Sequence, residues 1–289
     1  MELSSWVAGV MMLASSMQPM QLMVPAYFYP TPGGNQSEWT AIRTALDHGV
    51  GVTAIMNVAS GPGQAPNADY SAAIRAFRAA GGRVLGYVYT CYAQNTCVAG
   101  GPAKRSPEDV LRDVAKYAAW YEIDGIFLDE MATSASALPF YSAISRALRR
   151  DHPSWQLVGN AGAAAPKSYL SIVDSIVTFE GSGSDYANAA TMPWAAAESP
   201  QRQVNLLYNV ASVEAMQNAL RTAVARNAGY IYITDDRFTP GAGDPAENNP
   251  WDRLASYWGA EVSAVRALRD DRPDENKREP RTRRTARKH

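Results

Sequence analysis

Eight short runs rich in β-branched and aromatic residues recur along the chain, and most are followed by a longer stretch with helical spacing of apolar residues. This alternation constrains the fold more than any other feature, because strands that alternate with helices form parallel sheets with helical crossovers. Eight such units predict an α/β protein with one domain, a (β/α)8 TIM barrel. The expected strands are residues 23–29, 51–58, 83–90, 125–130, 156–160, 175–180, 204–209 and 230–236.

Signals at segment ends support the expected helices. Ser106 precedes Pro107, Glu108 and Asp109, which is the pattern of an N-cap followed by an N1 proline and an acidic first turn. The crossovers after the fifth and sixth strands show weaker helical patterns. The helices are expected at residues 38–48, 70–80, 107–121, 140–150, 213–227 and 250–268.

A doubly wound open sheet is the alternative fold, because it also alternates strands with helices. That fold usually carries a glycine-rich dinucleotide fingerprint directly after its first strand. The corresponding segment here reads "PTPGGNQ" (residues 30–36), which lacks the G-x-G-x-x-G spacing. The sequence therefore favours the barrel.

The two ends of the chain differ from the expected barrel at residues 23–268. Residues 1–22 contain a short apolar run and small residues, as a secretory signal does, but no basic residue precedes the run. Residues 269–289 hold nine Lys/Arg, five Asp/Glu and almost no apolar side chains, so burial cannot offset the entropy of ordering them. We expect a signal-like N-terminal segment, a disordered tail, and a secreted or cell-surface protein.

Charge and residue usage exclude several classes of function. Outside the tail, 18 basic residues face 23 acidic ones, so a nucleic-acid-binding surface is not expected. No apolar run is long enough for a transmembrane helix. With three histidines in the chain, and none near Cys91 or Cys97, we expect no metal and no cofactor. The two cysteines either close a small disulfide or stay free, and their spacing leaves both open.

Acidic side chains end two of the expected strands. Catalytic groups of a barrel gather at the carboxyl ends of its strands. Asp129 and Glu130 end the fourth strand and, as neighbours in a strand, should point to different faces, while Glu180 ends the sixth and should face across the mouth. Two carboxylates across a pocket suit glycoside hydrolysis, with retention at about 5 Å separation and inversion at roughly 6.5–9.5 Å. The sequence does not give that distance.

Aromatic and amide side chains also lie at the strand ends, where they suit sugar binding through stacking and hydrogen bonds. Tyr92 and Trp194 lie near these ends as well. Taken singly, each tyrosine is as often a core residue, and each acid more often a cap or an ion-pair partner, so the combination carries the hypothesis. The candidate substrate-binding residues are Tyr27, Tyr29, Asn57, Tyr87, Tyr89, Asn160, Tyr208, Asn209 and Asp235.

Six segments occur in order along the body: "YFYP" (27–30), "NVASGPG" (57–63), "GYVYT" (86–90), "DGIFLDE" (124–130), "VTFEG" (177–181) and "YIYITDD" (230–236). Together they resemble the spherulation-specific family 4, or spherulin-4-like, proteins, over about residues 23–258. The resemblance implies a (β/α)8 barrel. Its characterised fungal members, in glycoside hydrolase family 135, are metal-independent endo-hydrolases of α-1,4-linked N-acetylgalactosamine in galactosaminogalactan.

The resemblance also implies the catalytic acids, which are the Asp-Glu pair after the fourth strand and a later Glu. Carried over, these are Asp129, Glu130 and Glu180. By analogy with related barrels, Asp129 would be the nucleophile, Glu180 the general acid/base, and Glu130 would orient or tune the site. One departure is Tyr208, where many relatives have histidine, and it puts the sugar contacts there in doubt.

Two other functions compete with a hydrolase of an amino-sugar polysaccharide. A non-catalytic cell-surface or spore-associated carbohydrate-binding protein would use the same scaffold, but it has no need of paired acids. A metal-dependent polysaccharide deacetylase would need more histidines than the chain offers. The expected partner is a polysaccharide or oligosaccharide, and the expected state is a monomer.

Overall fold

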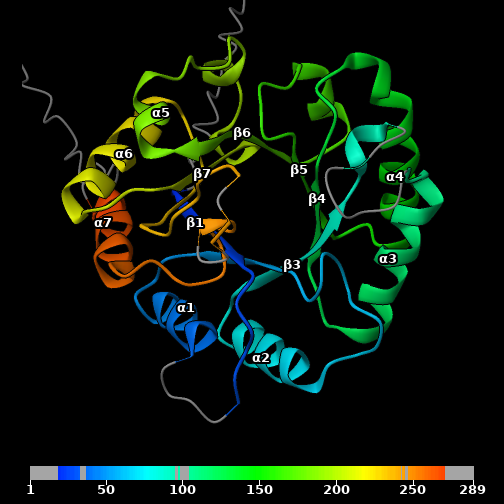
Figure 1. The fold of residues 1–289 in the computed structure, drawn as a ribbon, viewed down its shortest axis with the longest axis horizontal. Helices are drawn as coiled ribbons and strands as arrows, with labels where there is room; N and C mark the ends of the chain where they lie inside the picture. Colours follow the sequence, from blue (N-terminus) through cyan, green and yellow to red (C-terminus); the bar gives the residue numbers. More distant parts are fainter. Residues whose placement is uncertain are drawn as a thin grey trace, which may run out of the picture.

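The computed structural model describes residues 19–32, 37–94, 97, 104–241, 243–244 and 247–270. Within them, eight parallel strands in chain order close into a barrel, and the last strand pairs with the first (Figure 1). This confirms the predicted (β/α)8 barrel. The strands are β1 (Gln21–Ala26), β2 (Val52–Met56), β3 (Arg83–Tyr89), β4 (Gly125–Asp129), β5 (Gln156–Asn160), β6 (Ser175–Ser182), β7 (Gln203–Tyr208) and β8 (Tyr230–Ile233).

Helices surround the ring of strands (Figure 1). The crossover after β5 contains only the 3-10 turn Lys167–Ser171, and that after β6 contains the short α5, as the weak helical patterns there indicated. The α-helices are α1 (Glu38–Asp47), α2 (Ala68–Ala79), α3 (Pro107–Trp120), α4 (Leu138–Asp151), α5 (Gly183–Asn188), α6 (Val213–Ala225) and α7 (Trp258–Asp270).

Several expected boundaries are wrong by a few residues. The first strand begins at Gln21, inside the segment assigned to the signal-like N-terminus, and ends before Tyr27. The final helix begins at Trp258 rather than at residue 250, and it extends to Asp270. Residues 1–18 and 271–289, which hold most of the predicted signal-like segment and the predicted disordered tail, lie outside the described residues.

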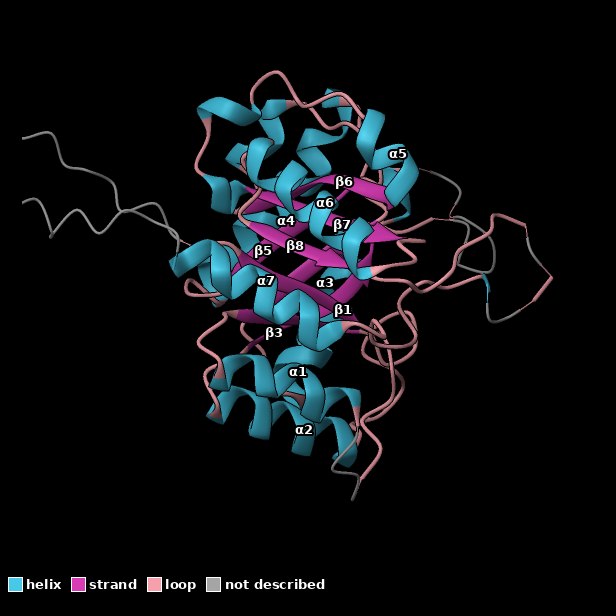
Figure 2. Ribbon diagram, turned by 90° about the vertical axis from the view of Figure 1, so that its left-hand side faces the viewer, coloured by secondary structure: helices cyan, strands magenta, loops and turns pink. Residues whose placement is uncertain are grey.

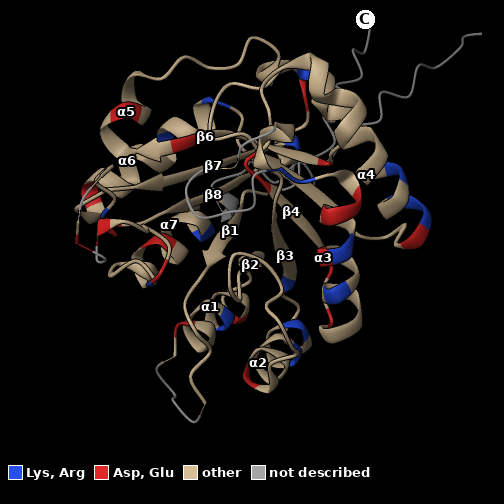
Figure 3. Cartoon of the chain, turned by 45° about the vertical axis from the view of Figure 1, so that its right-hand side comes forward, with Lys and Arg blue, Asp and Glu red and all other residues tan. Residues whose placement is uncertain are grey.

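The N-terminus of α3 follows the predicted capping pattern. The hydroxyl of Ser106 accepts a hydrogen bond from the backbone N–H of Asp109, and the Asp109 carboxylate accepts one from the backbone N–H of Ser106. This capping box and the N1 proline satisfy backbone donors that the first helical turn leaves free. Acidic and basic residues are mixed along α3 and α4 in the view of Figure 3.

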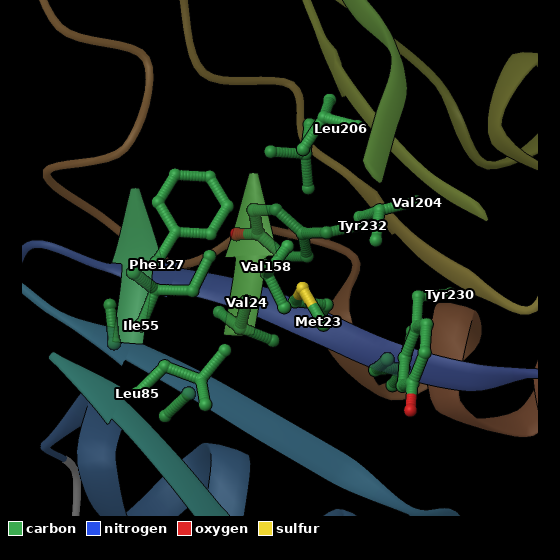
Figure 4. Close-up of a cluster of buried hydrophobic side chains, with 14 of the residues drawn as sticks. Met23, Val24, Ile55, Leu85, Phe127, Val158, Val204, Leu206, Tyr230 and Tyr232 are labelled. Atoms are coloured by element: carbon green, nitrogen blue, oxygen red, sulfur yellow. The ribbon is translucent and has the colours of Figure 1, made fainter. Parts of the chain in front are cut away.

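Apolar side chains fill the interior of the barrel. Phe127, Val158 and Leu206, from three different strands, belong to one buried cluster (Figure 4). Such layers make a barrel interior a packed core rather than a channel. The strand arrows of β6 and β7 point to one end of the barrel, where long loops gather (Figure 2). A site at that end of the barrel therefore lies directly above the packed apolar core.

The seam between β1 and β8 is short. Only two residue pairs form its register, which leaves the backbone N–H of Ile233 without a strand partner. Glu261, fully buried on α7, accepts a hydrogen bond from that N–H at 2.9 Å. Its other carboxylate oxygen has no partner among the described residues, and burial raises the pKa of Glu261 well above its usual range. Helix α7 thus completes the barrel wall with a carboxyl group.

Among the described residues, no helix combines the length and the apolar character that a bilayer span requires.

Candidate active site

Asn160, the last residue of β5, connects the two candidate acids on its flanking strands. Its side-chain nitrogen donates to Asp129 Oδ1 at 2.8 Å and to Glu180 Oε2 at 2.5 Å. Its oxygen accepts from the backbone N–H of Gly162 at 2.9 Å, which determines the end of the amide that faces the acids. Two oxygens bonded to one nitrogen at these distances lie within about 5 Å of each other, so the two carboxyl groups face each other across the Asn160 nitrogen.

A β-bulge in β6 directs Glu180 into the barrel. The register of β6 against β7 shifts between Val177 and Phe179, so that Glu180 pairs with Leu206 of the interior cluster. Without the extra residue, Phe179 would occupy this inward position, because side chains alternate along a strand. Phe179 instead packs on Tyr186 of α5, with ring centroids 4.6 Å apart. The bulge therefore places the acid Glu180, rather than the apolar Phe179, at the inward position of this strand end.

Asp129 is held by donors on both sides. The hydroxyl of Tyr87, which lies in β3, donates to Asp129 Oδ2 at 2.7 Å, and Asn160 occupies the other oxygen. The Tyr87 ring stacks on Phe127 below it, with centroids 6.4 Å apart. Burial raises the pKa of Asp129, and the hydrogen bonds from Tyr87, the Glu130 backbone and Asn160 oppose that rise.

Burial and the nearby Asp129 carboxylate raise the pKa of Glu180 to about 7, and hydrogen bonds from Asn160 and Trp251 partly oppose this. Asp129 has three donors to stabilise its anion, whereas Glu180 has two. Asp129 therefore ionises first, and its charge keeps a proton on Glu180. The pair holds one carboxylate and one carboxylic acid near neutral pH.

Glu130, which follows Asp129, has an unusual backbone conformation. Its backbone has φ of 50°, in the left-handed region, and its carbonyl accepts from the Tyr92 N–H at 2.6 Å. The hydroxyl of Thr90 donates to the same carbonyl at 2.8 Å and lies 3.0 Å from the hydroxyl of Tyr141. The Tyr141 hydroxyl accepts a hydrogen bond from the backbone N–H of Ala132. Burial and the charge of Asp129 raise the pKa of Glu130, against a hydrogen bond from the backbone of Cys91.

A disulfide joins Cys91 and Cys97, which decides the question that the sequence left open. Cys91 is fully buried and lies directly after β3 in a turn that contacts the backbone of Glu130. The bond therefore fixes the start of the β3–α3 loop beside the acids.

Some predicted substrate-binding residues lie close to the acids. The ring of Tyr27 packs edge-on against that of Tyr87 at 5.5 Å, and burial followed by the charges of Asp129 and Glu180 raises the Tyr27 pKa. Tyr208 is partly exposed, and burial and then Glu180 raise its pKa. Tyr27, Tyr87, Asn160 and Tyr208 thus form the surroundings of the acid pair.

Other predicted residues are engaged in local structure. The side chain of Asn209 exchanges two hydrogen bonds with the Phe238 backbone, and Asp235 accepts two from Ser256. Hydrogen bonds from Ser256 and the nearby Arg253 lower the pKa of Asp235, although burial acts in the opposite direction. Both side chains build the loops after β7 and β8.

The candidates after β1, β2 and β3 also have protein partners. Tyr29 is 48% exposed and donates to the Asp69 carboxylate at 2.5 Å. Asn57 accepts from the N–H of Gly61 within its own loop. The guanidinium of Arg105 lies 4.2 Å from the centre of the Tyr89 ring. Tyr29 and Asn57 thus bond to neighbouring loop and helix residues, whereas Tyr89 pairs in register with Asp129, so its side chain lies on the same face of the sheet as that acid.

Trp251 is a site residue that the sequence did not indicate. It was expected within a helix starting at residue 250, but residues 250–257 form a loop that leads back over the barrel end. Trp251 packs against Tyr208 and Tyr232, each at 6.0 Å, and forms a hydrogen bond to Glu180. No periodic pattern could reveal it, because its position depends on the loop path.

Within the part of the chain that the structure describes, no group of three or more His, Cys, Asp or Glu side chains is arranged to hold a metal ion. The two carboxyl groups of the acid pair can transfer a proton and act as a nucleophile.

Fold and site together define a (β/α)8 barrel with two acids, joined by one amide, at the carboxyl end of its strands. The chain belongs to the spherulation-specific family 4, whose family model matches residues 21–265. Spherulin-4 of Physarum polycephalum is 31% identical over 264 residues, which cover 88% of this chain and 73% of that protein.

Solved structures share the fold at low sequence identity. Sph3 of Aspergillus clavatus, crystallised in complex with GalNAc, has a TM-score of 0.65 and 23% identity over 86% of this chain and 98% of its own. The catalytic domain of a hyperthermophilic chitinase from Pyrococcus furiosus has a TM-score of 0.51 and 12% identity over 88% of this chain and 96% of its own. Both neighbours support the barrel architecture.

Proposed function

We propose that this protein is a glycoside hydrolase of an amino-sugar polysaccharide, and that it cleaves internal α-1,4 linkages of N-acetylgalactosamine. The observation that carries the proposal is the Asn160 amide, which holds Asp129 and Glu180 at one end of the barrel with their carboxyl oxygens within about 5 Å. The complex of Sph3 with GalNAc supports an amino sugar as the ligand class.

The pair assigns one role to each acid. Glu180, which keeps its proton near neutral pH, donates it to the glycosidic oxygen as the bond to the anomeric carbon breaks. A carboxylate oxygen of Asp129 attacks that carbon and forms a glycosyl ester. Water then attacks the anomeric carbon of this ester, gives its proton to Glu180 and releases the Asp129 carboxylate, so the two displacements retain the anomeric configuration.

The surrounding residues act on this pair. Tyr87 orients Asp129 through its hydroxyl, and Tyr27 and Tyr208 offer apolar ring surface beside the acids. Glu130 tunes the site through its charge interaction with Asp129, which raises the Glu130 pKa, and its backbone carbonyl supports the loop after β3. No step in this scheme requires a metal ion.

The disulfide and the charge of the barrel indicate where the enzyme works and which polymer approaches it. A disulfide between Cys91 and Cys97 suits an oxidising compartment, as for a secreted or cell-surface protein. The mildly acidic body favours approach of a partly de-N-acetylated, cationic polymer such as galactosaminogalactan. We propose that a monomer carries out the reaction, since each barrel holds a full acid pair.

Product release from purified α-1,4-linked N-acetylgalactosamine oligosaccharides, followed by mass spectrometry, tests the proposal. Wild type should yield shorter oligosaccharides, and Asp129→Asn and Glu180→Gln should not. Asp151→Asn, an exposed change at the far end of α4, is the matched control and should retain activity. Binding of the oligosaccharides without cleavage by the wild type would instead identify a carbohydrate-binding protein.

A further inference from the structure

The turn directly after β3 has an unusual backbone. Three consecutive non-glycine residues, Cys91, Tyr92 and Ala93, have φ of 50°, 54° and 53°. This left-handed region is disfavoured for residues with a side chain, because the Cβ approaches the following carbonyl oxygen. Backbone of this kind persists only where surrounding contacts hold it, and it concentrates at functional sites.

The contacts that hold this turn lead to the acid pair. The side chain of Cys91 is fully buried and bonded to Cys97. The backbone N–H of Cys91 donates to the Glu130 carboxylate, and that of Tyr92 donates to the Glu130 carbonyl at 2.6 Å. The turn is thus attached at two points to the residue that follows Asp129, so its position and that of the site are linked.

Tyr92 is the side chain that this turn presents to the site. It packs against the edge of the core and stays partly exposed. Its hydroxyl has no hydrogen-bond partner among the described residues. The hydrogen bond from the Tyr92 backbone to the Glu130 carbonyl at 2.6 Å places the residue beside the acids, and burial followed by the charges of Glu130, Asp129 and Glu180 raises the Tyr92 pKa.

We propose that Tyr92 is a sugar-binding residue and that the Cys91–Cys97 disulfide holds it in its binding position. Tyr92 comes from the β3 side of Asp129, whereas Asn160 and Glu180 lie on the β5 and β6 side. The ring therefore extends the binding surface past the nucleophile. A tyrosine fits this task, because its face stacks on a sugar ring and its hydroxyl donates to a sugar oxygen.

Loss of the disulfide should release the turn while leaving the barrel intact. The bond joins residues only six positions apart, so it removes little entropy from the unfolded chain. The left-handed turn, in contrast, loses one of the contacts that oppose its relaxation. Reduction of the bond should therefore weaken sugar binding in a protein that remains folded.

The inference rests on the proposed glycosidase function, and its test measures binding without turnover. Isothermal titration of N-acetylgalactosamine oligosaccharides into Glu180→Gln gives the reference affinity. Added Tyr92→Ala should weaken binding about tenfold and Tyr92→Phe about threefold, since the latter loses only the hydroxyl. Melting temperature and near-UV circular dichroism verify that each variant is folded.

A double-mutant cycle separates positioning from general stability. Cys91→Ser with Cys97→Ser should weaken binding when Tyr92 is present and should add little in the Tyr92→Ala background, because both changes remove the same contact. Equal losses in the two backgrounds would overturn the proposal, as would unchanged affinity on Tyr92→Ala.

Wild-type hydrolysis, assayed in parallel, keeps the two proposals distinguishable. Tyr92-dependent binding without cleavage by the wild type would refute the hydrolase and leave the role of Tyr92 standing. Cleavage by the wild type, with affinity that is indifferent to Tyr92, would do the reverse. No binding by the Glu180→Gln reference would overturn the inference as well.

Discussion

Replacement of Asn160 by leucine tests the central feature of the site. Leucine has nearly the same shape but no donor, so Asp129 and Glu180 lose the nitrogen that they share. During glycosylation, negative charge moves from Asp129 to Glu180, and the amide bonds to whichever acid carries it. Leucine removes this stabilisation throughout the step.

The size of the effect follows from the bonds lost. A hydrogen bond to a charged group contributes roughly 1.5–3 kcal/mol, and each 1.4 kcal/mol is a factor of ten in rate. We therefore expect kcat of Asn160→Leu to fall about 10- to 150-fold. Because the amide stabilises the ionised forms, its loss raises the pKa of both acids. The bell-shaped pH profile should therefore move to higher pH on both limbs.

The assay is kcat/KM on oligosaccharides from pH 4 to 9, with thermal melting to verify the fold. The matched control is Asn218→Leu on the exposed face of α6, which should change neither rate nor profile. A profile that moves to lower pH, or a rate within twofold of wild type, would refute the reasoning about the shared amide.

Three further changes give distinct results. Tyr87→Phe removes a donor to Asp129, so kcat should fall about tenfold and the acidic limb of the rate profile should move to higher pH. Because the folded pKa of Glu261 is raised, its contribution to stability is present below its usual pKa and declines as pH rises. Glu261→Gln should therefore unfold at higher urea concentration than wild type at pH 8, because its free energy of unfolding is higher by about 1 kcal/mol or more. This difference should shrink toward pH 4.5, and an equal difference at the two pH values would contradict the reasoning. In Gly125→Ala the new methyl group would lie 2.0 Å from a β5 carbonyl oxygen, so a loss of about 1–3 kcal/mol in urea unfolding is expected, and wild-type stability would show that β4 can shift.

The sequence predicts the strands well because each is a short apolar run with polar residues at its end. The end of β4 at Asp129 follows directly from four apolar residues that precede an acid. Asn160 is equally accessible, since it ends the run of β5. The local sequence pattern therefore identifies which residues lie at the strand ends.

Side-chain direction and loop path depend on partners far along the chain. The inward direction of Glu180 requires a bulge whose register is set by β7, and no feature within residues 175–182 alone specifies it. Trp251 reaches the acids because its loop folds back onto Tyr208 and Tyr232. Asn209 and Asp235 also end predicted strands, but their side chains bond to the loops that follow and not to the acid pair.

The short seam of the barrel also has a consequence for how the chain reaches its fold. The two residue pairs that join β1 to β8 link positions about 200 residues apart, the costliest kind of contact to form early. The other seven strand pairs join strands that are consecutive in sequence, so they can form before the β1–β8 pair. Glu261 can bond to Ile233 only after α7, the last helix, has packed against the barrel. Closure of the ring is therefore expected to be the final folding event, and the amide hydrogens of Gln21 and Ile233, which bond at the seam to the Gly229 carbonyl and to Glu261, should exchange with solvent before those of β4.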